Sequence, residues 1–297
     1  MNFWHLLADA ISKQTGRAFT VQEHQALSGG CINEAYRIAG LGAEYFVKIN
    51  KIECLKLFEA EMHGLQEIAS SATVRVPKPV LVGSLGERAF LVMEYIELSS
   101  GESAARLGEE LARLHHVTRS DFGWVRDNAI GLTSQLKPST SSWIEFWRDS
   151  RLGYQLKLAE RNGYGGALQK LGERLMENLD KFFANYSPAA SLLHGDLWGG
   201  NYATDPQGAP VIYDPAPYFG DRETDIAMTE LFGGFSREFY LAYDKAWPLD
   251  AAYSTRKTLY NLYHVLNHLN LFGGGYGRQA ENMMRSLLAE LSYGTSE

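Results

Sequence analysis

The first third of the chain contains short runs in which hydrophobic and polar residues alternate, whereas the later part repeats hydrophobic residues at intervals of three and four. Alternation is typical of half-buried strands, and the longer period is typical of amphipathic helices. Strands are predicted at Glu34–Ile38, Tyr45–Asn50 and Ala89–Leu98. The pattern therefore predicts an α+β fold with a β-rich N-terminal part and a mainly helical C-terminal part.

Helices are predicted on both sides of Leu98. The N-terminal segment repeats Phe3, Leu7 and Ile11 at helical spacing, and a second helix is predicted from about Lys56 to Ala69. The helices after Leu98 are predicted at Glu102–His116, Trp143–Arg161, Leu168–Phe183, Arg237–Trp247, Thr255–Asn270 and Gln279–Leu291. No hydrophobic run approaches the ~20 residues of a membrane-spanning helix.

The segment His194–Asn201, HGDLWGGN, follows a short apolar strand and places Asp196 and Asn201 five positions apart. This is the spacing of a kinase catalytic loop, in which the aspartate accepts a hydrogen bond from the attacking hydroxyl and the asparagine oxygen binds Mg²⁺. A predicted hairpin then leads to Asp214 behind the apolar run Val211–Tyr213. We expect Asp196 to be catalytic and the oxygens of Asn201 and Asp214 to bind Mg²⁺.

Lys48 is the single charge in the strand YFVKIN, so it requires an anionic partner or an exposed strand edge. The functional interpretation is a lysine that contacts the nucleotide phosphates and pairs with a helical glutamate. Glu61 and Glu59 both lie on the following predicted helix, and Glu61 is preferred because it directly precedes the packed Met62. Spacing alone does not exclude Glu59 as the partner of Lys48.

Two further segments are expected to bind the nucleotide. Gly29 and Gly30 form a glycine pair before Lys48, which suits either a plain hairpin turn or a lid whose N–H groups approach phosphates; its place in the chain favours the lid. After Ala89, the strand AFLVMEYIEL is expected to join two lobes, with Met93 facing the adenine and the backbone of Glu94–Ile96, Tyr95 included, contacting ATP.

The chain resembles the fructosamine kinase (ketosamine 3-kinase) family, within the aminoglycoside phosphotransferase and protein-kinase-like superfamily. The resemblance rests on HGDLWGGN, on DPAPYFGDRETDIAMTELFGGF from Asp214 and on NHLNLFGGGY from Asn267. It implies a bilobal kinase-like fold, with residues 1–96 as the nucleotide-binding lobe, residues 97–297 as the catalytic and substrate-binding lobe, and the nucleotide in the cleft between them. It also implies ATP and Mg²⁺ as cofactors, and phosphorylation of the 3-hydroxyl of ketosamines or glycated proteins, a deglycation repair.

The acceptor pocket is expected near Asp196. Candidate residues are aromatic or close to the motifs, because aromatic faces suit the C–H side of a sugar. They are Trp198, Tyr218, Phe219, Phe232 and His268. A neighbouring hypothesis is an aminoglycoside- or choline-type kinase, and a third is a non-catalytic nucleotide-binding regulator.

Asp225 follows the second motif at the spacing of a residue that braces the catalytic loop in related kinases. The family commonly shows His-Arg-Glu where this chain has Asp221, Arg222 and Glu223, so a substrate contact at Asp221 is in doubt.

Composition agrees with this interpretation. A net charge of −7 argues against a nucleic-acid partner. Only two cysteines occur, which predicts no disulfide framework and a cytoplasmic location. One of them, Cys31, lies in the expected lid. A small residue in a tight turn is the preferred interpretation, and the resemblance implies a redox switch as the alternative, because some members of the family use a cysteine there in that way. The sequence predicts no oligomeric state.

Overall fold

The computed structural model describes residues 2–28, 32–101 and 103–293. It divides into two compact units, the first made of Met1–Ser103 and Tyr202–Pro215, and the second of Ala104–Asn201 and Ala216–Glu297. In this division the hairpin that follows Asn201 belongs to the first unit, and the lobe boundary expected between residues 96 and 97 stays a prediction.

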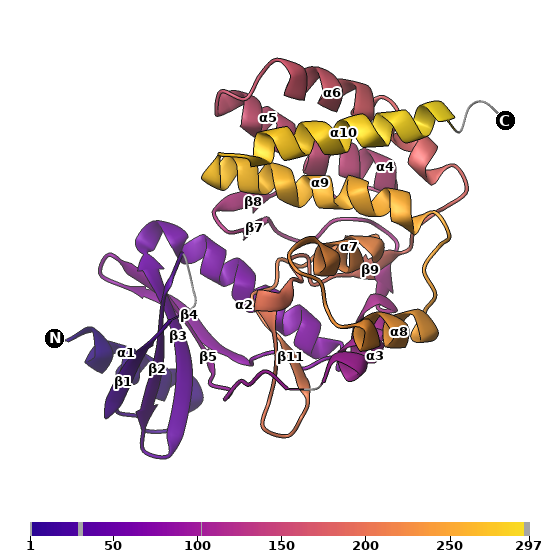
Figure 1. Cartoon of the computed structure of the whole chain (residues 1–297). Coiled ribbons are helices and arrows are strands. Elements are labelled where there is room, and N and C mark those ends of the chain that lie inside the picture. The colour runs from indigo at the N-terminus through magenta and orange to yellow at the C-terminus, as the bar shows by residue number, and fades with distance from the viewer. Residues whose placement is uncertain (1, 29–31, 102, 294–297) are drawn as a thin grey trace. The chain divides into compact units, whose positions relative to one another are not determined.

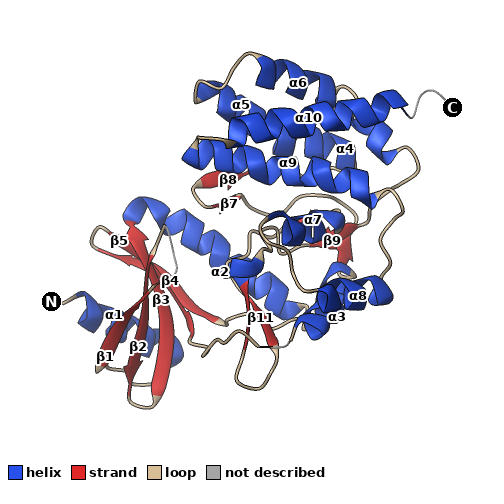
Figure 2. Cartoon of the chain, viewed as in Figure 1, coloured by secondary structure: helices blue, strands red, loops and turns tan. Residues whose placement is uncertain are grey.

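A five-stranded antiparallel sheet forms the centre of the first unit (Figure 2). Its strands lie in the order β1-β2-β3-β5-β4. Their bounds are β1 Glu23–Leu27, β2 Glu34–Gly40, β3 Ala43–Lys51, β4 Pro79–Leu85 and β5 Arg88–Glu94. In the central strand β3, Val47 and Ile49 are fully buried, and Lys48 lies opposite Ala35 of β2 and Leu91 of β5. The functional lysine therefore starts from the middle of the sheet.

Two helices accompany this sheet. Helix α1, Phe3–Thr15, begins at Asn2, whose side chain accepts a hydrogen bond from Trp4 N, and ends at Gly16 in the left-handed conformation. Its Leu7 and Ile11 form a core with Ile38 and Val92 of the sheet. Helix α2, Leu55–Ser70, follows a short 3₁₀ turn, Ile52–Cys54, and packs on β4 and β5. The hairpin of β10, Tyr202–Thr204, and β11, Pro210–Ile212, completes the unit.

The second unit is mainly helical (Figure 1). Its helices are α3 Ala104–His115, α4 Trp143–Phe146, α5 Gly153–Arg161, α6 Ala167–Met176, α7 Glu223–Leu231, α8 Arg237–Ala246, α9 Tyr253–Phe272 and α10 Tyr276–Tyr293. Short strands form a three-stranded sheet in the order β12-β9-β6 and a separate hairpin, β7–β8. Their bounds are β6 Thr118–Arg119, β7 Asn128–Ile130, β8 Thr133–Gln135, β9 Ala190–Leu192 and β12 Phe219–Gly220.

Packing in the second unit centres on the long helix α9, which contacts α7, α10 and α5, while α3 packs against α8. Nearly every residue of α9 from Leu259 to Leu269 is buried. The short strand β9 lies between β12 and β6, contacts α3 and leads into His194 and the loop that follows it.

The predicted α+β fold, β-rich at first and mainly helical later, is confirmed. Several elements end at other residues than predicted. The predicted strand Ala89–Leu98 ends at Glu94, and the helix predicted at Leu168–Phe183 ends at Met176 before a 3₁₀ turn at Leu179–Phe183. The helix predicted at Trp143–Arg161 contains a π-helical segment at Trp147–Leu152. The start predicted at Glu102 lies outside the described residues.

Helix α7 was not predicted from the sequence. Seven of its nine residues, Glu223 to Thr229, are buried, so its hydrophobic and polar positions show no amphipathic period. Its buried polar residues have partners in neighbouring elements, as described below.

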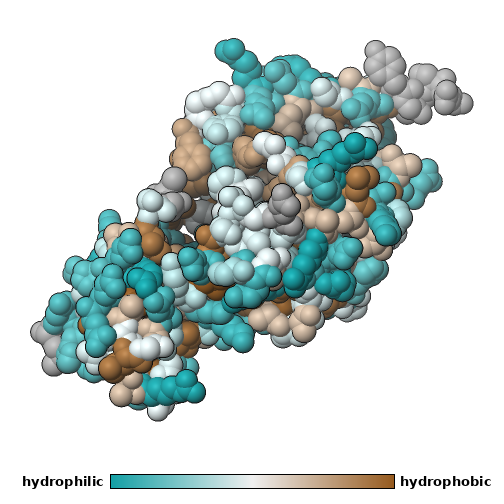
Figure 3. All heavy atoms as spheres, turned by 60° about the horizontal axis from the view of Figure 1, so that its bottom comes forward, coloured by the Kyte–Doolittle hydropathy of each residue, from teal (hydrophilic) through white to brown (hydrophobic). Residues whose placement is uncertain are grey.

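The surface is predominantly polar on the face that Figure 3 shows, with hydrophobic residues scattered among hydrophilic ones. None of the helices in the described ranges combines the length and hydropathy needed to cross a bilayer.

Candidate active site

Lys48 lies at the centre of a three-residue ion cluster in the first unit, here called the Lys48 cluster. Its Nζ is 2.6 Å from Glu61 Oε1 and 2.6 Å from Asp214 Oδ1. Burial disfavours the ammonium form, but the two carboxylates outweigh burial and raise the pKa of Lys48. The lysine is therefore charged, and its helical partner is Glu61, as preferred from the sequence, and not Glu59.

Asp214 follows β11 and has a left-handed backbone with φ of 57°. This conformation is uncommon for a residue other than glycine and is found more often for aspartate than for most residues. The side chain of Asp214 is 47% exposed, far more than that of Lys48. Its carboxylate thus combines one bond to the lysine with access to solvent, which suits an oxygen ligand of Mg²⁺.

The end of β5 carries the residues expected to contact adenine. Met93 is buried and lies opposite Phe46 of β3, whereas Glu94, Tyr95 and Ile96 are partly exposed. Glu94 N donates to Lys78 O over 2.8 Å, so this N–H is not available to a nucleotide. Any backbone contact of Glu94 with adenine must use its carbonyl. Gly29, Gly30 and Cys31 of the expected lid lie outside the described residues.

The loop His194–Asn201, here called the HGD loop, belongs to the second unit and is held through its backbone. The buried Asp225 carboxylate accepts hydrogen bonds from His194 N over 2.7 Å and from Gly195 N over 2.9 Å. Gly195 has φ of 84°, and a Cβ there would lie 2.0 Å from Ala216 O, so only glycine fits. The structure confirms that Asp225 braces the loop.

His115 supports this brace from the end of α3. Its Nε2 lies 3.2 Å from Asp225 Oδ2, and its Nδ1 lies 2.7 Å from the Tyr243 hydroxyl. Burial disfavours the charged form of Asp225, but the hydrogen bonds from His115 and Gly195 hold its pKa below the ordinary value. The sequence analysis did not assign this role to His115. The spacing of Leu107, Leu111 and His115 at intervals of four places them on one helix face and indicates that His115 is buried, but not which residue it contacts.

Asp196 and Asn201 are joined within the loop. Asn201 Nδ2 donates to the Asp196 carbonyl over 2.8 Å, which directs the amide nitrogen into the loop and leaves Oδ1 as the acceptor. Asp196 is partly exposed and Asn201 is buried. Amide and carboxylate oxygens are the ligands that Mg²⁺ prefers, so the donor chemistry of Asn201 and Asp214 fits this ion.

The expected acceptor residues occupy different environments in the second unit. Trp198 is 40% exposed, and a Cβ at Gly200 would lie 2.3 Å from its indole, so the glycine lets this ring lie on the loop. Phe232 and His268 pack together with ring centroids 4.7 Å apart. Tyr218 is buried, with the Arg151 guanidinium 4.2 Å from its ring centroid, an arrangement that favours packing over substrate contact. Phe219 is buried in β12.

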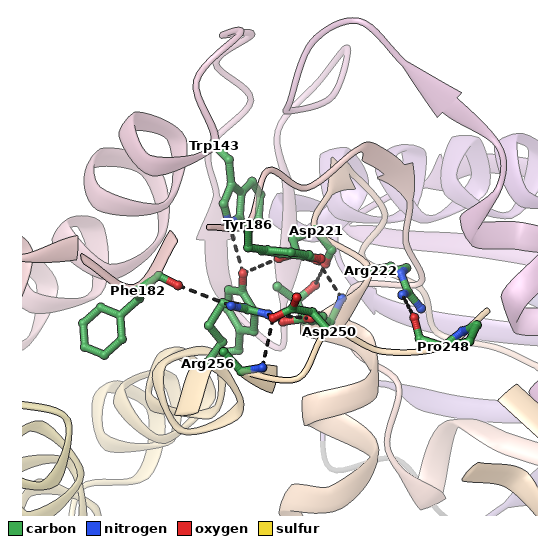
Figure 4. A network of polar contacts seen from close by, with 12 residues as sticks. Trp143, Phe182, Tyr186, Asp221, Arg222, Pro248, Asp250 and Arg256 are labelled. Carbon is green, nitrogen blue, oxygen red and sulfur yellow. Dashed lines mark hydrogen bonds and ion pairs between the residues drawn. The ribbon is translucent and has the colours of Figure 1, made fainter. Parts of the chain in front are cut away.

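A buried polar network surrounds the start of α7 (Figure 4). Asp221 accepts hydrogen bonds from Tyr186 over 2.9 Å and from Tyr260. Glu223 forms a two-point ion pair with Arg256, at 2.7 Å from Nε and 3.0 Å from Nη2. Burial raises the pKa of Glu223 to about 7, although the Arg256 guanidinium lowers it. These partners make Asp221 a structural residue, and they fix the helix that carries Asp225.

The cluster on a β-rich unit and the HGD loop on a helical unit define a phosphotransferase of the protein-kinase-like fold. A family model described as fructosamine kinase matches residues 3–290. The chain belongs to the fructosamine kinase family, whose members transfer a phosphoryl group to a hydroxyl.

Individual relatives are similar to this chain over most of their length. A probable ketoamine kinase of Synechocystis is 44% identical over 288 residues, 96% of this chain and 97% of that protein. The chloroplastic protein-ribulosamine 3-kinase of Arabidopsis thaliana is 41% identical over 281 residues, 93% of this chain and 86% of that one. The crystal structure of a putative fructosamine-3-kinase from Haemophilus somnus matches with a TM-score of 0.88 at 27% identity, covering 97% of this chain and 100% of that chain.

Proposed function

We propose that the protein transfers the γ-phosphate of ATP to the 3-hydroxyl of a ketosamine, such as a ribulosamine or fructosamine formed by glycation of an amine or protein. The braced loop that presents Asp196 carries the kinase part of this proposal. The substrate part is supported by the relatives, which are named as ketoamine and protein-ribulosamine kinases. Phosphate is a better leaving group than hydroxide, so after enolisation of the adduct the bond between carbon 3 and oxygen breaks and phosphate departs. Water then hydrolyses the resulting imine and releases the amine.

In this reaction Asp196 accepts the hydrogen bond of the acceptor hydroxyl and orients it toward the phosphorus. Lys48, held by Glu61, contacts the nucleotide phosphates, and Met93 with the backbone of residues 94–96 contacts the adenine. Asn201 and Asp214 supply the oxygens that hold Mg²⁺. When bound, Mg²⁺ neutralises charge on the phosphates.

Trp198, Phe232 and His268 are the residues that we expect to contact the sugar that accepts the phosphoryl group. Tyr218 suits this contact less well, because other side chains enclose it. The His268 Nδ1 lies 2.9 Å from the His264 carbonyl, so this nitrogen carries the proton and the neutral ring has Nε2 as its acceptor. An aromatic neighbour and a directed acceptor suit a sugar with several hydroxyls. We also propose a cytoplasmic location, on the basis of the cysteine content.

A substrate panel tests this function. Purified protein with Mg-ATP is offered a synthetic ribulosamine, a fructosamine, an aminoglycoside and choline, and ADP release and product mass are measured. We expect phosphorylation of the ketosamines alone. Phosphorylation of the aminoglycoside or choline in place of the ketosamines would overturn the substrate assignment, and nucleotide binding without turnover of any acceptor would favour a regulator. Repeating the panel with and without reductant tests whether Cys31 acts as a redox switch.

A further inference from the structure

Arg75 links three segments of the first unit, although it lies in a loop between α2 and β4. Its Nη2 is 2.9 Å from Glu94 Oε1 at the end of β5, and its Nη1 pairs closely with Asp205 Oδ2 in the turn of the β10–β11 hairpin. Its backbone carbonyl accepts a hydrogen bond from Ile212 N over 3.0 Å. One residue thus holds both the turn of this hairpin and its second strand.

The Asp205 carboxylate requires this partner. Its side chain is only 2% exposed, and a buried carboxylate is costly unless it is paired and hydrogen-bonded. Its other oxygen, Oδ1, accepts from Gln207 N over 2.9 Å and from Ala209 N over 2.8 Å, which closes the turn. The turn therefore has bonds of its own, and the Arg75 pair attaches the formed hairpin to the rest of the unit.

Asp214 lies just beyond the strand that this attachment holds. Asp214 follows Ile212, the last residue of β11 and the one that donates to the Arg75 carbonyl, by two residues. Its left-handed backbone must be maintained by its surroundings. On the other strand, Thr204 exchanges two backbone hydrogen bonds of 2.9 Å with Ser99, so β10 is held independently of Arg75. Replacing the Arg75 side chain leaves its backbone carbonyl, and hence the bond from Ile212 N, in place. It does leave the buried Asp205 carboxylate without its cation, and Asp205 Oδ1 holds Ala209 N directly before β11. The β11 side, which carries Asp214, is therefore expected to loosen from its turn end.

We propose that Arg75 is a positioning residue for Asp214, and that it sets the affinity of the protein for the divalent cation bound with the nucleotide. This inference rests on the proposed function, which makes Asp214 a metal ligand. Glu94 keeps contacts that do not involve Arg75, because its backbone N donates to Lys78 O and its Oε2 accepts from Lys78 N over 3.2 Å. The adenine contacts near Glu94 are thus expected to change little when Arg75 is removed.

The test compares Arg75→Ala with Arg88→Ala. Arg88 Nη2 forms a 2.7 Å ion pair with Glu34 in the same unit, outside the hairpin, so the control also removes one arginine–glutamate pair. Mn²⁺ binding to the complex with AMP-PNP is measured by electron paramagnetic resonance, and AMP-PNP binding is measured separately in EDTA. Supports of metal ligands typically contribute 10–100-fold to metal affinity or activity, so we expect Arg75→Ala to weaken Mn²⁺ binding about tenfold and to lower kcat similarly. Metal-free AMP-PNP binding should stay within about twofold.

Two further variants test the role of Arg75 if Arg75→Ala folds poorly. Arg75→Lys should restore part of the Mn²⁺ affinity, because an ammonium can pair with one of the two carboxylates. Asp205→Asn keeps the shape and the turn acceptor but loses the charge, and it should weaken Mn²⁺ binding in the same direction.

Mn²⁺ affinities of Arg75→Ala and Asp205→Asn that equal those of wild type and Arg88→Ala would overturn the inference. A wild-type protein that binds Mn²⁺–AMP-PNP but phosphorylates no ketosamine would instead count against the proposed substrate alone.

Discussion

The Lys48 cluster of the first unit and the HGD loop of the second unit are held in different ways. The cluster consists of three charged side chains that pair with one another, and one of them, Asp214, is half exposed. The loop is held by backbone N–H groups that donate to the buried Asp225 carboxylate. Side-chain pairs can exchange partners when phosphates and a cation arrive, whereas a backbone braced by a buried charge is ordered in advance. Variants of the cluster should therefore weaken the binding and use of nucleotide and metal, and variants of the loop should lower kcat.

The largest effect is expected from Asp196→Asn in the loop. The amide has the shape of the carboxylate but accepts a hydroxyl proton poorly, and a positioned base contributes about 10²–10⁴-fold. We expect kcat to fall about 1000-fold while the dissociation constant for ATP changes little, measured by a coupled assay and by calorimetry. A variant that keeps more than about a tenth of wild-type kcat would remove Asp196 from the base role.

A smaller loss is expected from Lys48→Met in the cluster. The substitution removes the charge that faces the phosphates and leaves the Glu61 and Asp214 carboxylates without their cation, and loss of one such electrostatic group costs about 100-fold. The loss should appear in kcat/KM for ATP. Glu61→Gln is the matched variant, and it should cost about tenfold because it loosens the lysine without removing it. Equal effects of the two variants would contradict a direct role for Lys48.

The brace itself is tested by Asp225→Asn against Asp221→Asn. Both residues are buried carboxylates, Asp221 just before α7 and Asp225 within it, and among the hydrogen bonds of the described residues only those of Asp225 reach the HGD loop. Each variant should lower the free energy of unfolding by about 1–3 kcal/mol, because buried donors lose a charged acceptor. We expect kcat to fall about tenfold for Asp225→Asn and to stay near wild type for Asp221→Asn. A common loss of kcat would mean that the comparison reports only general destabilisation.

The last prediction concerns stability and not turnover, and it involves His264, which belongs to neither arrangement. Burial lowers its pKa from 6.5 to about 3, and its Nδ1 has no hydrogen-bond partner among the described residues. Below pH 6.5 the unfolded chain gains a proton that the folded chain does not. The free energy of unfolding should therefore fall as the pH falls from about 6.5 toward 3, by up to about 1.4 kcal/mol per unit. Denaturant unfolding of wild type and His264→Leu should show a weaker dependence in the variant; identical slopes would contradict this assignment.

The sequence predicted the elements that have a clear period and the site residues that have a fixed spacing. The Lys48 strand, the hairpin before Asp214 and the helix with Glu61 all carry such signals, and the Lys48–Glu61 pair was found as preferred. Helix α7 was missed because it is buried on all sides. The roles of His115 and Arg75 were missed because their partners lie 110 and 130 positions away in the chain, where no local pattern connects them.

The most direct test of the central claim is the position of the phosphate in the product. Wild-type protein is incubated with Mg-ATP and a synthetic ribulosamine, and the product is examined by ³¹P–¹H correlation NMR. The account predicts a phosphorus resonance coupled to the proton on carbon 3, which is absent when Asp196→Asn replaces the wild type. A phosphate on another hydroxyl, or no transfer to the ketosamine by the wild type, would contradict it.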